Sequence, residues 1–422
     1  MGTTQRLLPA RSPLRRQAYR RLWLGQAASR LGDQFTVIAL LWFVLQLTGS
    51  GAAVGIVVLC FELPAVLTGP FLGRLLDRAQ PRVLMGADNL LRAALIALVP
   101  TLSALGVLQL WQVYVIAACA GALSPATLVG VRVMLPSLVP DSELDQANAL
   151  SSFNLQFAAL VGPVVAGILV AALGGLWALL IDAASFVVMG ALVLTLPNTP
   201  RERRVAQDRR EGRWLGFGAL FAMKDVRALT LLSLVFFLSY GPLEVALPVY
   251  NQNVLHAGAT GYGLLWTGFG AGAVLGALGT PLVARLRRPG VLLAWIAVLW
   301  GALLGPLVVL RLLPPAMLFL ALAGCAWAPY TAIETTLLQR LIPQRMHGEV
   351  FGARSTVTTA AAPLGAVLGG LLLSVSSAPA VIGVSALACV LTGVLSLASP
   401  TLRGLRRIDA GSESVPVVAE RA

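Results

Sequence analysis

The chain has 422 residues, of which 57% are hydrophobic and 12% are charged, and its formal net charge is +13. Soluble domains carry roughly 25% charged residues, so this composition excludes an ordinary soluble protein. The arginines are scattered between apolar stretches rather than gathered on one folded face, which argues against nucleic-acid binding. The four cysteines lie inside apolar stretches without paired spacing, and we expect no disulfide, metal site or cofactor.

Twelve apolar stretches have close to the length of about 20 residues that crosses a bilayer. The predicted spans are 22–47, 52–73, 82–104, 109–134, 146–172, 175–196, 228–250, 260–284, 290–310, 315–338, 350–375 and 379–401. Connections that follow the odd-numbered spans contain no lysine or arginine apart from Arg311, whereas arginines are frequent elsewhere between the spans and at both termini. Because positive residues stay on the cytoplasmic side, this asymmetry predicts a cell-membrane protein with both termini in the cytoplasm.

The longest connection, 197–227, carries charges of both signs and divides the chain into two halves of six spans. We therefore expect a cytoplasmic N-terminal segment, two six-helix bundles joined by this cytoplasmic connection, and a cytoplasmic tail, with bounds at 1–21, 22–196, 228–401 and 402–422. Near the end of the connection, apolar residues recur at helical spacing, which predicts a short amphipathic helix on the membrane surface. These residues are Trp214, Phe217, Leu220 and Phe221.

The connection between the second and third spans reads Gly-x-x-x-Asp-Arg-x-x-x-Arg, and we expect a turn over 73–83. The matching residues are Gly73, Asp77, Arg78 and Arg82. This pattern resembles the signature loop of the major facilitator superfamily, although the usual second glycine is missing. The resemblance implies an all-α integral membrane protein with twelve transmembrane helices in two six-helix halves and a substrate site between the halves. It also implies that this loop latches the halves in one state of an alternating-access cycle.

The fifth span contains Gly162, Pro163 and Gly167 in an order that resembles the antiporter signature of the same family. In the family this motif is associated with exporters. The alternative is close helix packing through small residues, without any consequence for the direction of transport. The proton-coupling arginine that the family carries in the fourth span is replaced here by Ala117, so any coupling to protons must use other residues.

Asp33 is the leading candidate for a functional residue, because a carboxylate near the middle of a span is unfavourable unless it is paired, hydrated or protonated. Arg30 lies one turn earlier on the same face, so a structural Arg30–Asp33 pair is the alternative. Glu62 and Glu244, in the second and seventh spans, are further candidates for proton coupling or substrate binding. For each glutamate, the alternative is a polar residue that faces a hydrated vestibule.

Three further charged residues are secondary candidates. Asp182 is expected near the outer end of its span, where it either caps a helix or takes part in transport. Arg132 and Glu334 are expected near the inner ends of the fourth and tenth spans, as gating or structural charges. Asp88 and Arg92 we assign to a cytoplasmic charge network around the signature loop.

These features together favour a secondary transporter that exports small amphipathic or hydrophobic compounds by proton antiport, similar to the enterobactin and macrolide exporter branch of the family. An importer of a small metabolite with the same fold stays open, as does a membrane sensor that transports nothing. A membrane enzyme is disfavoured, because the chain has only 2 histidines and short outer connections. The expected partners are a small-molecule substrate, protons and the lipid bilayer, with no nucleic acid, and a monomer is favoured.

Overall fold

The computed structural model describes residues 12–198, 217–283, 288–343 and 346–405. Every regular element in these residues is a helix, and 12 helical segments are long and apolar enough to cross a membrane. The chain is therefore an all-α integral membrane protein, as the composition and the spans predict. Some predictions concern residues outside the described ones, namely 1–11, Trp214 and the tail beyond residue 405.

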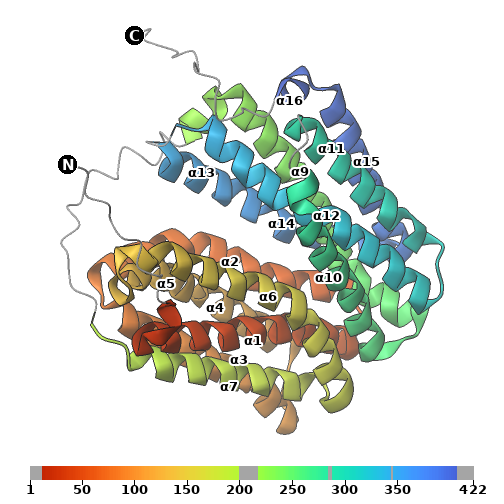
Figure 1. The fold of residues 1–422 in the computed structure, drawn as a ribbon. Coiled ribbons are helices and arrows are strands. Elements are labelled where there is room, and N and C mark those ends of the chain that lie inside the picture. The colour runs from red at the N-terminus through yellow and green to blue at the C-terminus, as the bar shows by residue number, and fades with distance from the viewer. Residues whose placement is uncertain (1–11, 199–216, 284–287, 344–345, 406–422) are drawn as a thin grey trace, which may run out of the picture.

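The first group of helices contains six of these spans (Figure 1). Its helices are α1 (Gln17–Thr48), α2 (Gly51–Arg78), α3 (Pro81–Ala104), α4 (Leu110–Leu123), α5 (Pro125–Leu138), α6 (Asp141–Leu173) and α7 (Gly175–Leu194). Helices α4 and α5 form one span that is interrupted at Ser124, because Pro125 supplies no backbone N–H to continue the helical hydrogen bonds.

The second group contains the other six spans (Figure 1). Its helices are α9 (Lys224–Tyr250), α10 (Gly258–Val283), α11 (Pro289–Leu304), α12 (Leu313–Leu341), α13 (His347–Thr359), α14 (Ala361–Val375), α15 (Ala378–Ala398) and the short α16 (Pro400–Gly404), with two single turns, η2 (Asn251–Leu255) and η3 (Gly305–Val308). Helices α13 and α14 form one span with a break at Ala360, just before Pro363. Helix α16 lies partly within the predicted tail, which begins at residue 402.

The signature segment is more helical than the sequence predicts. A turn is expected over 73–83, yet α2 continues to Arg78, and the turn contains Ala79 and Gln80 alone. The residues that end α2 are compatible with a helix, and the chain leaves the helical conformation only before Pro81, because a proline disfavours helical geometry in the residue that precedes it. The signature residues from Gly73 to Arg78 therefore belong to the last turns of a helix.

The predicted amphipathic helix is present in part. Residues 217–222 are helical and are separated from α9 by one residue. Leu220 is buried, whereas Phe221 is exposed, as expected for a helix with one face against the protein. This segment is followed by Met223, which is not helical.

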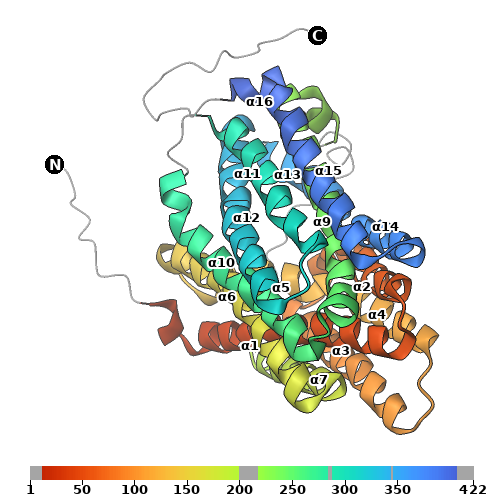
Figure 2. The same ribbon diagram turned by 90° about the vertical axis from the view of Figure 1, so that its right-hand side faces the viewer.

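Each group is held together by helices that pack side by side. In the first group, α1 packs against α6 and α7, and α3 packs against α7; in the second, α9 packs against α14 and α15, and α10 against α12. The two groups meet where α2 contacts α14 and where α6 contacts α10, as Figures 1 and 2 also show.

Glycines make these two contacts between the groups possible. Gly167 on α6 lies against the backbone of Gly263 on α10, so that a Cβ atom at either has no space. Gly55 on α2 lies against the backbone of Gly370 on α14, where a Cβ atom at either would fit only tightly. All four lie toward the end of the molecule at which α1 ends and α2 begins, which we call the far end. The groups are thus in close backbone contact at the far end.

Candidate functional site

Asp33 forms an ion pair in the interior of the first group. The Nη2 atom of Arg92, on α3, donates to Oδ1 of Asp33, on α1, at 2.5 Å, although the two residues are 59 positions apart. The Arg92 side chain is 4% exposed and that of Asp33 is 23% exposed. The Arg92 guanidinium also lies 4.0 Å from the ring centre of Phe186. The carboxylate of Asp33 is therefore matched by a buried cation in the span region.

This pairing corrects two expectations. The ion pair of Asp33 is made with Arg92 and not with Arg30, so the alternative of an Arg30–Asp33 pair is wrong. The assignment of Arg92 and Asp88 to a cytoplasmic network is also wrong, because both are buried within the bundle. The spacing of these residues along the chain contained no signal for the partner, which is set by the packing of α1 against neighbouring helices.

Asp182 belongs to the same buried cluster. The Thr36 hydroxyl, on α1, donates to one of its carboxylate oxygens, and the Ser185 hydroxyl donates to the other at 3.0 Å. Asp182 is fully buried within α7, whose N-cap is Gly174, so a capping role for Asp182 is wrong. A Cβ atom at Gly32 would overlap Asp182, which shows how closely α1 and α7 approach here.

Asp88 completes the polar interior of this group. Its carboxylate accepts a hydrogen bond from the Thr127 hydroxyl, on α5, and Thr127 in turn accepts one from the Asn89 amide at 2.7 Å. Asp88 and Asn89 are almost fully buried. Buried polar groups in a membrane protein need partners inside the protein, and these hydrogen bonds provide some of them, whereas Oδ1 of Asp88 and Oδ1 of Asn89 are buried without a hydrogen-bond partner.

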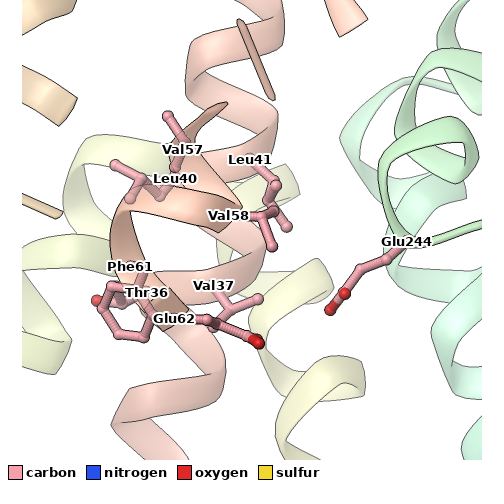
Figure 3. A pocket seen from close by; sticks show the side chains of 9 residues that line it. All are labelled: Thr36, Val37, Leu40, Leu41, Val57, Val58, Phe61, Glu62 and Glu244. Atoms are coloured by element: carbon pink, nitrogen blue, oxygen red, sulfur yellow. The ribbon is translucent and has the colours of Figure 1, made fainter. Parts of the chain in front are cut away.

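Glu62 and Glu244 face each other where the two groups meet. Glu62 is on α2, Glu244 is on α9, and Figure 3 shows their carboxylates pointing toward one another across one pocket. The pocket has a volume of about 20 Å³ and is otherwise lined mainly by aliphatic side chains. A cavity needs about 10–15 Å³ to hold one water molecule, so the pocket has room for water but not for a drug-sized molecule.

Thr36 connects the pocket to the buried cluster. It lines the pocket that contains the two glutamates, and its hydroxyl donates to Asp182. Sequence reasoning did not select Thr36, because a threonine in an apolar span usually bonds to its own helix backbone. Its importance comes from its position on α1, between α2 and α7.

The second group has its own buried ion pair. The Arg354 guanidinium, on α13, donates to the Glu334 carboxylate, on α12, and the Ser233 hydroxyl donates to the same oxygen. Tyr330 lies within hydrogen-bond distance of Ser233, at 3.1 Å. Glu334 thus has its charge partner within the second group, whereas Arg132 is exposed at the surface of the first group.

The motif residues mark places where helices approach closely. Gly162 faces the side chain of Gln34, and Pro163 lies inside α6, which remains helical through it.

In the signature loop, Arg82 donates to the backbone oxygen of Leu196 at 2.9 Å and so connects the start of α3 to the end of α7. The side chains of Asp77 and Arg78, and the surroundings of Gly73, are not among the described parts of the structure, so the predicted latch stays a prediction. Among the side chains that are described, no group of three or more His, Cys, Asp or Glu is arranged to hold a metal ion.

Comparison with known proteins identifies the family of this chain. The family model described as Major Facilitator Superfamily matches residues 22–366. The chain is 30% identical over 391 residues to the multidrug efflux pump Tap of Mycobacterium tuberculosis (strain ATCC 25618 / H37Rv), covering 89% of this chain and 91% of that one. It is 24% identical over 370 residues to macrolide efflux protein A of Streptococcus pyogenes, covering 83% of this chain and 88% of that one.

Solved structures share the fold at lower sequence identity. The nucleoside transporter NupG superposes with a TM-score of 0.72 at 13% identity, covering 90% of this chain and 98% of that chain. A bacterial homologue of the iron transporter ferroportin, in an inward-facing state, superposes with a TM-score of 0.71 at 20% identity, covering 92% of this chain and 99% of that chain. At these identities the likeness concerns the fold alone.

Proposed function

Because the chain belongs to the major facilitator superfamily, we propose that this transporter exports small amphipathic or hydrophobic compounds in exchange for protons. The efflux names of its relatives support the direction, as does the motif at Gly162, Pro163 and Gly167. The two helix groups are proposed to move as six-helix bundles, 22–196 and 228–401, in a monomer.

The arginine distribution supports a topology with both termini in the cytoplasm and the far end at the outer face of the cell membrane. The backbone contacts at Gly55–Gly370 and Gly167–Gly263 then close the outer side. On this basis we propose that the structure represents the inward-facing state of an alternating-access cycle.

The observation that carries the proton coupling is the facing pair of Glu62 and Glu244. Two carboxylates that meet in a pocket with a low dielectric constant repel each other when both are ionised, so their close approach favours a shared proton. Since one carboxylate comes from each bundle, separation of the bundles relieves this repulsion. Protonation therefore favours contact of the bundles at this pocket, and deprotonation favours their separation.

This linkage has the sign that an exporter needs. Protons that enter from the outer side favour the state in which the outer side is closed and the transporter faces inward. Loss of the proton to the cytoplasm, together with binding of a substrate, favours the return to the outward-facing state. Thr36 lines the pocket and donates to Asp182, which interacts electrostatically with Arg92 and Asp33, so we propose that it transmits the state of the pocket to this cluster.

The test is transport in inside-out membrane vesicles with an imposed proton gradient and a panel of lipophilic dyes and macrolides. We expect accumulation of at least one compound that depends on the gradient and collapses with a protonophore. The double variant Glu62→Gln with Glu244→Gln should lose this accumulation and retain downhill flux. Accumulation by right-side-out vesicles only would instead identify an importer, and undiminished accumulation by the double variant would remove the glutamates from coupling.

A further inference from the structure

A second pocket lies at the far end, between the two bundles. Its volume is about 780 Å³, within the range of about 300–1,000 Å³ that ligand pockets usually have. The first bundle contributes the turn 49–51. The second contributes the ends of α9 and α14, the turn η2, the start of α15, and two residues of the connections, His256 and Arg311. The pocket therefore depends on contact between the bundles.

The charge of this pocket is one-sided. None of the residues that line it is an aspartate or a glutamate. The predicted connections that follow the odd-numbered spans contain no lysine or arginine apart from Arg311. Its recorded hydrogen bonds, to the backbone oxygens of Val308 and Leu310 at 3.1 Å each, use Nη1 alone. The rest of the guanidinium is available to an acceptor in the pocket.

Two long helices begin at the pocket and add donors to it. Ser50 is the N-cap of α2, and Ser377 is the N-cap of α15; each side-chain oxygen accepts a backbone N–H of its own helix. Neither helix has an acidic residue in its first turn. The first N–H groups of a helix have no acceptor inside the helix, and they carry a partial positive charge. Both helix starts therefore reinforce the charge of Arg311.

We propose that this pocket binds a phosphate-type oxyanion, supplied by the headgroup of an anionic lipid in the outer leaflet or by free phosphate. The guanidinium of Arg311 recognises the oxyanion, and the hydroxyls of Ser50 and Ser377 donate to it. Since the lining comes from both bundles, an anion in the pocket favours the state in which the outer ends are together. The site is separate from the pocket of Glu62 and Glu244 and does not depend on the direction of transport.

The experiment uses the purified full chain in neutral detergent, with the thermal unfolding midpoint as readout. The titrants are short-chain phosphatidylglycerol, phosphatidylcholine with the same acyl chains, and inorganic phosphate at constant ionic strength. The variant is Arg311→Gln. The matched control is Arg403→Gln, because Arg403 is also an exposed arginine bonded to a backbone oxygen at a helix end, that of Ala398 at 3.1 Å, but lies outside the pocket.

For the wild type we expect a saturable rise of the midpoint with phosphatidylglycerol or phosphate, and none with phosphatidylcholine. Loss of one charged hydrogen-bond partner should weaken the apparent affinity about tenfold in Arg311→Gln and leave Arg403→Gln unchanged. A response to phosphatidylglycerol alone assigns the site to a lipid headgroup, and a response to both assigns it to a free anion.

A second variant protects the test against misfolding of Arg311→Gln. Ser374→Glu places a carboxylate at an exposed position in the lining and leaves Arg311 intact, so it should abolish the response by repulsion. Identical titrations of the wild type, Ser374→Glu and Arg403→Gln, or no saturable response to any titrant, would overturn the proposal.

Discussion

Replacement of Asp33 by asparagine should destabilise the protein, because Asp33 is the counterion of Arg92. The pair is joined at 2.5 Å, and the Arg92 side chain is 4% exposed, so Asp33→Asn leaves a buried cation without its partner. Removal of one member of a buried ion pair costs about 3–5 kcal/mol. Because the Asp33 side chain is 23% exposed and water reaches it, we expect the lower end of this range, about 3 kcal/mol.

The assay is unfolding in mixed detergent micelles, followed by tryptophan fluorescence. Arg30→Gln is the matched control, since Arg30 is partly buried, lies one turn away on α1 and is outside the ion pair. Substitutions outside buried polar networks usually alter stability by about 0.5 kcal/mol or less. The double variant Asp33→Asn with Arg92→Met should recover part of the loss, because it removes the unpaired cation as well.

Unfolding of Asp33→Asn like that of the wild type would contradict a buried ion pair. The same holds for a double variant that is less stable than Asp33→Asn by the full cost of a second, independent substitution. The prediction also affects transport experiments. A loss of activity in Asp33→Asn identifies a proton carrier only when the variant is folded and inserted as well as the control.

Three further predictions concern the contact between the bundles. Thr36→Val should lose a buried hydrogen bond to a charged group, which costs about 1.5–3 kcal/mol of stability, and should reduce proton-driven accumulation. Thr36→Ser keeps the hydroxyl and should keep both the stability and the accumulation. Equal behaviour of the two variants in unfolding and vesicle assays contradicts a role for the hydroxyl. The single replacements Glu62→Gln and Glu244→Gln should each weaken the dependence of transport on the proton gradient, measured as accumulation at a series of imposed gradients. If both variants depend on the gradient as the wild type does, the two glutamates have no role in proton coupling. Gly263→Leu should lower inward-facing occupancy and transport about fivefold or more, because overpacking costs about 1–3 kcal/mol, while Gly279→Leu on the same helix, with open space at its Cβ, should transport normally.

The candidate site could be predicted only in part. The sequence singled out Asp33, Glu62 and Glu244, because a carboxylate in an apolar span is unfavourable wherever the helix lies, and all three are indeed at polar clusters or pockets of the structure. It missed Thr36 and misplaced Arg92, because neither residue is unusual until the neighbouring helix is known.

The amino-acid sequence by itself determined the number of spans and the helical class. Both follow from the length and polarity of continuous segments. Each segment must hydrogen-bond its own backbone polar groups inside the bilayer, and its length must match the thickness of the hydrocarbon core. Only the tertiary structure decided which charges meet: Asp33 pairs with a residue 59 positions away, and Asp182 is bonded to one 146 positions away. Partners at such separations depend on the rotation and crossing of helices, which close contacts such as that of Gly32 with Asp182 fix and which the periodicity of a single helix does not contain.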